Sequence, residues 1–251
     1  AGRHLQPQDL AVLAAVGCTQ VPVARQPQVG LLATGDEVIP AAETPAPAQI
    51  RNSNSHQLAA LVRLAGGNPQ DLGIARDNAA TLEQAIAGAV ESCDIVLSTG
   101  GVSMGDYDLV PGVLEALGFE TKLRRVAIQP GKPIVFGVRG EKAFFGLSGN
   151  PVSSFVQFEL LVRPFLAALQ GVDPAPLELH LPVLETMRRK NADRMAWVPV
   201  RLETGGVRPV RFHGSAHAHA LCHADGLVAY PVGVHDLQAG QRVAVRLCRW
   251  R

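Results

Sequence analysis

The feature that most constrains the fold is an alternation of short apolar runs with amphipathic helical segments over residues 29–169. The apolar runs are typical of buried strands, and the segments between them carry apolar residues at helical spacing. Strands that alternate with helices form a parallel sheet covered on both faces. We therefore expect an α/β fold, with a parallel or mixed sheet sandwiched by helices. The predicted strands are 29–33, 72–75, 94–98, 134–138 and 143–146, and the main predicted helices are 53–65, 79–92, 110–117 and 152–169.

The pattern changes after Gly171. Residues 173–178 read as a proline-rich linker, and short alternating runs follow it: LHLPVLE, WVPVRLE, VRPVRF, GLVAYPV and QRVAVRLC. Short strands of this kind form a small all-β barrel or sandwich. We expect residues 1–26 to be the end of an incomplete N-terminal domain and a connector, residues 27–172 the α/β domain, and residues 176–251 a C-terminal β-barrel domain.

Composition excludes several classes of function. The 23 Lys and Arg residues balance 22 Asp and Glu residues, and aromatic residues make up 5% of the chain. A polyanion-binding protein would carry a basic excess, so we expect no nucleic-acid partner. No apolar run approaches the roughly 18–20 residues of a membrane span. The four cysteines form no CxxC pair, which favours a reduced, cytoplasmic protein.

Carboxylates follow several of the predicted strands. Asp36 and Glu37 follow the first strand, Asp77 follows the second, and Asp106 and Asp108 follow the third. Ligands bind at the carboxyl ends of parallel strands, so these side chains gather at one edge of the sheet. Such a set suits Mg²⁺, which prefers a few carboxylates and substrate oxygens. The alternative is that they are helix caps and solvated turn residues.

The same edge carries a predicted anion site. The segment SGNPVSS at 148–154 opens the longest predicted helix, with Asn150 as its N-cap and Pro151 at its first position. The N–H groups of the next three residues would then be free to bind an oxyanion, assisted by the helix dipole. Lys132, in the loop QPGKP, would add a positive charge. The three N–H groups are those of Val152, Ser153 and Ser154.

Glycines surround Ser103 in TGGVSMGD, where Gly100 and Gly101 allow the backbone to approach a ligand closely. The stretch also matches G-x-S-x-G, the nucleophile elbow of serine hydrolases. That alternative is disfavoured, because the elbow needs its serine directly after the strand. Here the two glycines have already ended the strand.

Histidines cluster in HGSAHAHALCH, near the C-terminus. Four histidines and one cysteine could bind zinc, although no spacing here matches a closed structural site. The alternative is a polar loop with incidental histidines. The residues are His213, His217, His219, Cys222 and His223.

Six motifs, in order, resemble those of the MoeA/gephyrin-E family of molybdenum insertases: TGDEV, IRNSNSHQL, GIARDN, DIVLSTGGVSMGDYD, QPGKPIVFG and GLSGNPVSSF. The resemblance implies a molybdopterin-binding α/β domain followed by a β domain. It implies an enzyme that inserts molybdate into adenylylated molybdopterin, with release of AMP and with help from Mg²⁺. The implied partners are the pterin nucleotide, a second copy of the chain in a homodimer and the adenylyltransferase that precedes it in the pathway.

The resemblance also assigns roles by position. The catalytic residues would be Glu37, Asp77, Asp108 and Lys132, with Asp77 and Asp108 holding the metal. The binding residues would be Gly100, Gly101, Ser103, Ser148, Asn150, Pro151 and Ser153.

The chain departs from the family pattern at three positions. Gln129 stands where the family commonly has Lys, Ser148 where it commonly has Pro, and His219 where it has small or hydroxyl residues. Losing a cation at 129 should weaken an oxyanion site. The chain matches only the last part of the family's first domain, so alone it should turn over substrate poorly. Two alternatives are an adenylyltransferase-like enzyme and a non-catalytic scaffold.

Overall fold

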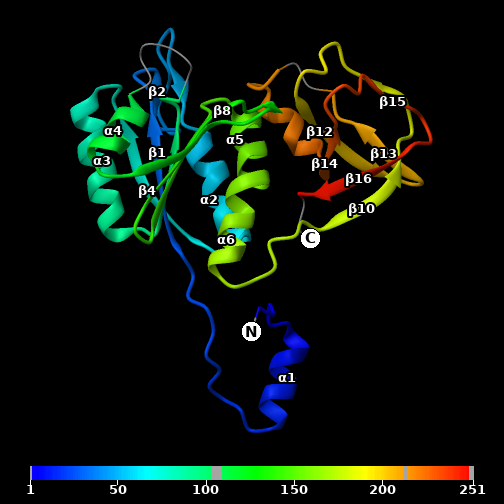
Figure 1. Cartoon of the computed structure of the whole chain (residues 1–251), viewed down its shortest axis with the longest axis horizontal. Coiled ribbons are helices and arrows are strands. Elements are labelled where there is room, and N and C mark those ends of the chain that lie inside the picture. The colour runs from blue at the N-terminus through cyan, green and yellow to red at the C-terminus, as the bar shows by residue number, and fades with distance from the viewer. Residues whose placement is uncertain (1, 103–108, 212–213, 249–251) are drawn as a thin grey trace.

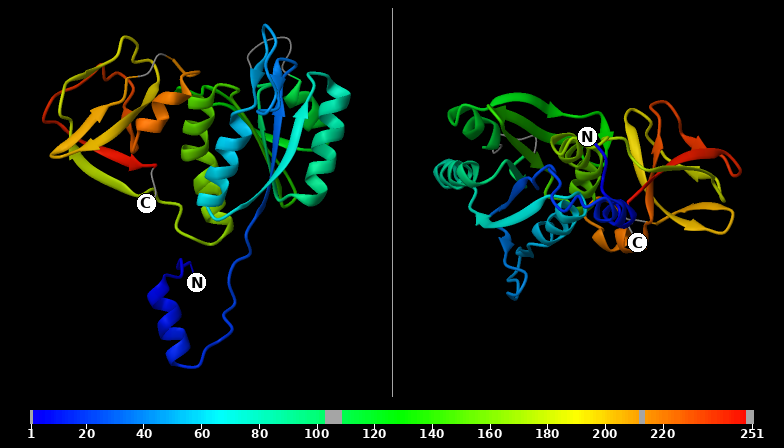
Figure 2. Two further views of the ribbon diagram at one scale, coloured as in Figure 1. Left: turned by 180° about the vertical axis from the view of Figure 1, so that it is seen from behind. Right: turned by 90° about the horizontal axis from the view of Figure 1, so that it is seen from below.

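The computed structural model describes residues 2–102, 109–211 and 214–248. An N-terminal helix, α1 (Pro7–Ala15), buries none of its residues and lies apart from the body at the end of an extended connector (Figure 1). The α/β part and the β part lie side by side above it, and the views from behind and below agree (Figure 2).

The described residues form a six-stranded sheet with the order β4-β1-β5-β9-β8-β6. The first four of these strands run parallel to one another. Strand β8 pairs antiparallel with β9, and β6 pairs antiparallel with β8. The predicted α/β fold with a mixed sheet is confirmed. The strands are β1 (Gln28–Thr34), β4 (Asn68–Ala75), β5 (Ile95–Thr99), β6 (Glu120–Arg125), β8 (Pro133–Arg139) and β9 (Lys142–Leu147).

Strand β6 was not predicted, because its sequence ETKLRR carries no apolar alternation strong enough to signal a strand. It lies at the sheet edge, where one side of the backbone needs no partner and exposed charged residues are tolerated. Strand β4 is also longer than the predicted 72–75, since its exposed first half pairs with β1.

Helices cover both faces of the sheet, as predicted for parallel strands (Figure 1). On one face, α3 (Ala79–Ser92) and α4 (Val110–Ala116) bury Leu82, Ile86 and Leu114 against the sheet. On the other, α2 (Asn54–Leu64) and the long helix at 151–169 bury Leu58 and Phe158. A small parallel pair, β2 (Val38–Ile39) and β3 (Ile50–Arg51), lies between β1 and α2.

The long helix is interrupted by a π turn. It consists of α5 (Pro151–Gln157), the π turn Phe158–Val162 and α6 (Arg163–Leu169). Pro164 lacks an N–H, so a regular α-helical bond cannot form there and the backbone adjusts locally. By length and composition the helix Pro151–Leu169 could cross a membrane, but half of its most apolar window is buried inside the protein, as in a core helix.

The C-terminal part is an antiparallel sheet with the order β10-β16-β14-β12-β13. A bridge between Val183 and Val207 joins its two edges, so the sheet curls around the core that contains Val200, Val228 and Tyr230. This confirms a C-terminal β domain. Its elements are β10 (Glu178–Pro182), β11 (Met187–Arg188), β12 (Met195–Glu203), β13 (Gly206–Pro209), the 3-10 helix Ala218–His223, β14 (Gly226–Tyr230), β15 (Asp236–Leu237) and β16 (Arg242–Leu247).

Backbone contacts join the two parts. A short strand from the α/β part, β7 (Ile128–Gln129), pairs in parallel with the first residues of β12. Nearby, the Arg194 guanidinium donates to the Ile128 carbonyl at 3.2 Å. On the long helix, the Glu159 carbonyl accepts from Arg246 at 3.1 Å. The loop between β7 and β8 is therefore anchored to the β domain.

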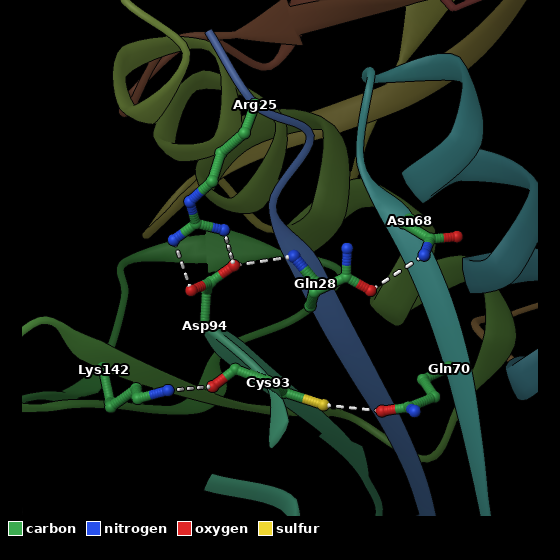
Figure 3. A network of polar contacts seen from close by, with 7 residues as sticks. All are labelled: Arg25, Gln28, Asn68, Gln70, Cys93, Asp94 and Lys142. Atoms are coloured by element: carbon green, nitrogen blue, oxygen red, sulfur yellow. Dashed lines mark hydrogen bonds and ion pairs between the residues drawn. The ribbon is translucent and has the colours of Figure 1, made fainter. Parts of the chain in front are cut away.

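A polar network closes the edge where the parallel strands begin (Figure 3). Asp94 accepts two bonds from Arg25, at 2.5 and 2.7 Å, and one from the Gln28 N–H at 2.8 Å. Beside it, the Lys142 ammonium donates to the Cys93 carbonyl at 2.9 Å. These bonds fasten the connector to the start of β1 and β5. We call this edge the amino edge and the opposite one the carboxyl edge.

Candidate active site at the carboxyl edge

A cavity of about 1280 Å³ lies between the carboxyl edge and the β domain. Its walls come from the turns after β1, β5 and β9, from the loop before β8, and from the β domain. Three residues singled out from the sequence, Ser103, Asp106 and Asp108, lie outside the described residues, and Asp77 is not part of the lining. The predicted residues that do line it are Glu37, Gly100, Gly101, Lys132, Ser148, Asn150, Pro151 and Ser153.

Close backbone packing brings the turns together. The Gly100 N–H donates to the Leu147 carbonyl at 3.1 Å, which joins the end of β5 to the end of β9. Gly100 has φ +94°, and a Cβ there would lie 2.7 Å from the Thr34 carbonyl oxygen. Only glycine meets both conditions, because the backbone is left-handed and the neighbour is backbone. The glycines therefore let three strand ends share one edge.

Three carboxylates crowd the ends of β1 and β4. The Asp77 N–H donates to Asp36 Oδ1 at 3.4 Å, and the Glu37 carboxylate folds over Gly35. Burial raises the pKa of Asp77, and the negative charges of Glu37 and Asp36 raise it further. Burial and like-charge repulsion thus both disfavour the ionised form of Asp77, and a nearby cation would offset both.

The donor set at this point fits Mg²⁺, since it offers hard carboxylate oxygens that lie beside a cavity with room for substrate. Within the described residues, no three His, Cys, Asp or Glu side chains are arranged to hold a metal alone. Mg²⁺ commonly takes only one or two protein carboxylates and completes its shell with water and phosphate oxygens. Asp77 as a metal ligand therefore stays a prediction.

Lys132 contributes a positive charge to the lining of the same cavity. It is half-buried in the loop between β7 and β8. Throughout the described ranges, no hydrogen bond or ion pair engages its ammonium group. A half-buried cation without an internal partner is available to an anionic ligand.

The predicted helix N-terminus differs from expectation in one respect. Asn150 is the N-cap and Pro151 the first residue, as predicted, but the Asn150 side chain caps no helix N–H. The Val152 N–H donates to the Ser215 carbonyl at 3.0 Å, and the Ser154 N–H to the Asn150 carbonyl at 2.9 Å. The prediction of three free N–H groups is therefore wrong, because a loop 63 residues away occupies one and the helix itself another. Of the three N–H groups, that of Ser153 has no hydrogen-bond acceptor among the residues that the structure describes.

Asn54 is a site residue that the sequence did not reveal, because an Asn at the start of a helix is most simply a cap. The cap position is Ser53, and its side chain makes no capping bond. Asn54 lines the cavity, and its Nδ2 donates to the Gly149 carbonyl at 2.7 Å. Its Oδ1 is buried and has no partner among the described residues. A buried, unsatisfied acceptor beside a cavity suits a ligand N–H.

The β-domain wall of the cavity is basic, which was also not predicted. Arg188 and Lys190 are exposed on it, and Arg189 and Arg194 also line it but are half-buried. Arg189 is fully engaged, with bonds to three backbone carbonyls at 2.6–2.7 Å. The basic residues in MRRKNADR could have indicated a basic surface. The sequence could not show that this surface faces the carboxyl edge, because that depends on how the β domain packs against the α/β part.

The histidine cluster does not form a described metal site. The 3-10 helix brings His219 Nε2 to 3.4 Å from His223 Nε2. No third ligand of the metal-binding types joins them in the part of the chain that the structure describes, and His213 lies outside it. The zinc hypothesis gains no support.

The two parts of the fold match two known families. Residues 30–168 match the family described as "Probable molybdopterin binding domain", and residues 183–248 match "MoeA C-terminal region (domain IV)". The family match places this α/β domain, with its cavity at the carboxyl edge, in the class of molybdopterin-binding domains. The chain belongs to this molybdopterin-binding family, in the arrangement typical of MoeA.

Relatives extend the match over nearly the whole chain. It is 33% identical to the molybdopterin molybdenumtransferase of a Nostoc species, over 98% of this chain and 58% of that protein. It is 32% identical to the enzyme of the same name from Bacillus subtilis, over 99% of this chain and 59% of that protein. The MoeA molybdopterin biosynthesis protein of Pyrococcus horikoshii superposes with a TM-score of 0.87 at 34% identity, over 100% of this chain and 61% of that one. The chain therefore spans about three fifths of the length of these relatives.

Proposed function

We propose that this chain carries the molybdate-insertion site of a molybdopterin molybdenumtransferase. The substrates would be molybdate and adenylylated molybdopterin, and the products the molybdenum-loaded pterin and AMP. The observation that carries this proposal is the charge that lines one cavity, where the Glu37 carboxylate lies among cations that include Lys132, Arg188 and Lys190. Such a cavity suits a substrate that combines a pterin, phosphates and an oxyanion.

Each wall has a role in this proposal. Lys132 and the Ser153 N–H would bind molybdate, because an ammonium group and a helix N-terminus both favour a dianion. Asn54 Oδ1 would accept a hydrogen bond from the pterin ring, and Arg188 and Lys190 would balance the phosphate charge. Gly100, Gly101, Ser148, Asn150 and Pro151 would shape the backbone against the ligand.

The carboxylates would act on the adenylate. Asp77 and Asp108 would hold Mg²⁺, with Glu37 close to it, and the metal when bound supplies charge neutralisation at the phosphate. The mutual repulsion of Asp77 and Glu37 keeps this corner ready for a cation. Ser103 belongs to the same proposal through its position in the motif.

The wider setting is proposed on the same basis. The name of the relatives points to molybdenum cofactor biosynthesis. We extend the proposal to a cytoplasmic homodimer that works next to an adenylyltransferase, as the resemblance of the motifs implies. The thiols of Cys93 and Cys248 are not joined in disulfides, which agrees with a reducing compartment.

The test is a single-turnover assay. The protein is mixed with adenylylated molybdopterin and Mg²⁺, with and without molybdate, and released AMP is measured by chromatography. We expect AMP release that depends on molybdate. Binding of the pterin without AMP release under any of these conditions would favour the scaffold alternative and contradict the proposal.

A further inference from the structure

Gln157 lies at the end of α5, outside the cavity lining, and none of its surface is exposed. Its amide makes three hydrogen bonds, all to backbone groups. Oε1 accepts from the Ser148 N–H at 2.8 Å, and Nε2 donates to the Gly131 carbonyl at 2.9 Å and to the Pro133 carbonyl at 2.6 Å. The two carbonyls flank Lys132 on either side.

The orientation of this amide is determined by its neighbours. If its oxygen and nitrogen were exchanged, an oxygen would face two carbonyl oxygens and an NH₂ group would face an N–H. The amide therefore connects the loop that carries Lys132 with the turn that carries Ser148 in one arrangement only.

We propose that Gln157 is a positioning residue that fixes the spacing between Lys132 and the turn at 148–153, and thereby sets the affinity for a tetrahedral oxyanion. The inference rests on the proposed function. Gln157 does not touch the ligand. It acts by holding the backbone of Lys132 while the ammonium group stays free.

Two further contacts fit this role. Gly131 has φ +101°, and a Cβ there would lie 2.9 Å from Gln157 Cγ, so the loop packs directly on this side chain. The residues just before the loop, Ile128 and Gln129, pair with β12 of the β domain. The loop is therefore held by the β domain at its start and by Gln157 around Lys132.

The experiment is a double-mutant cycle read by molybdate calorimetry. The variants are Gln157→Met, Lys132→Ala and the double variant. Removing the amide should weaken molybdate binding about five- to tenfold, the worth of one or two hydrogen bonds. If Gln157 acts through Lys132, the two changes will not add, and Gln157→Met will cost less when Lys132 is already absent.

A matched control separates positioning from general stability. Gln170 is the C-cap of the same long helix, and its Nε2 donates to the Ala65 and Leu166 carbonyls at 2.9 and 3.0 Å, away from the cavity. Gln170→Met should lower the melting temperature without changing molybdate affinity. If Gln157→Met fails to fold, Gln157→Glu replaces it, since this change alters the amide donors at constant shape and should weaken binding in the same way.

The results separate a failure of the positioning role from a failure of the anion site. Additive losses, or wild-type affinity in Gln157→Met while Lys132→Ala binds weakly, would overturn the positioning role alone. An unchanged affinity in Lys132→Ala, or no molybdate binding by the wild-type protein, would overturn the anion site and this inference together.

Discussion

The two edges of the large sheet differ in whether their charged side chains have partners inside the protein. At the amino edge, Arg25 and Lys142 have their hydrogen-bond partners inside the protein (Figure 3). At the carboxyl edge, the Lys132 ammonium has none among the described residues, and Asp77 lies beside carboxylates of its own sign. The exposed Asp36 of the carboxyl edge does pair with Arg76, at 3.7 Å, so the difference between the edges lies in Lys132 and Asp77.

The pKa values of one aspartate at each edge are shifted in opposite directions. Hydrogen bonds from Arg25 hold the pKa of Asp94 below its usual range, despite partial burial. Burial and then Glu37 raise the pKa of Asp77. A lowered carboxyl pKa means that the folded state stabilises the charge, and a raised one means that it does not. The ionised Asp94 at the amino edge therefore stabilises the folded state. The ionised Asp77 at the carboxyl edge destabilises it, and a bound cation would offset that cost.

The largest effect should come from the carboxyl edge. We expect Asp77→Asn to reduce Mg²⁺-dependent hydrolysis of the pterin adenylate by roughly 100-fold or more, because charge neutralisation at the phosphate is lost. Asp108→Asn should behave alike. Since ionised Asp77 is disfavoured in the folded state, Asp77→Asn should leave the melting temperature unchanged or slightly higher at pH 7. Asp71→Asn, in the middle of β4, is the control, and full activity in Asp77→Asn would remove this carboxylate from the mechanism.

The next effect is one of stability and belongs to the amino edge. Asp94→Ala removes an acceptor of three charge-assisted bonds and should cost about 1.5–3 kcal/mol of unfolding free energy, measured in urea. Molybdate affinity should not change. Glu83→Ala, at an exposed position of α3, should have little effect. A loss below about 0.5 kcal/mol, the level of an ordinary surface substitution, would show that this network does not stabilise the sheet.

The pH dependence of that loss follows from the lowered pKa of Asp94. Its contribution is fully present above the ordinary carboxyl pKa and disappears as the pH falls through the lower pKa of the folded state. The difference between wild type and Asp94→Ala should therefore be constant near neutrality and shrink below about pH 4. A difference that grows as the pH falls would contradict the assignment.

The smallest effect concerns the cavity wall. Gln129 is exposed there, and Gln129→Lys would add a second cation near Lys132. We expect molybdate binding to strengthen by about threefold at low ionic strength and by less at high salt, since screening weakens the interaction. Calorimetry at two salt concentrations measures this. Weaker binding in the variant would place the anion away from this loop.

Local pattern was sufficient for much of the fold. The helix expected at 79–92 spans Ala79–Ser92, because apolar spacing and the cap at Asn78 act within the segment itself. Convergence of the motifs followed from the rule that parallel strands end at one edge. What could not be predicted depends on long-range packing. The Val152 N–H is taken by Ser215, and Gln157 reads in sequence as an ordinary polar residue on an apolar helix.

Lys132 at the carboxyl edge has no charged partner among the described residues, and Lys132→Ala tests most directly whether an oxyanion binds to it. Molybdate titration by calorimetry should show affinity about ten- to hundredfold weaker than wild type, or about 1.5–3 kcal/mol. Lys122→Ala, which removes an exposed lysine already paired with Glu120, should leave affinity unchanged. If Lys132→Ala binds molybdate as tightly as wild type, the anion binds elsewhere and this account of the site is wrong.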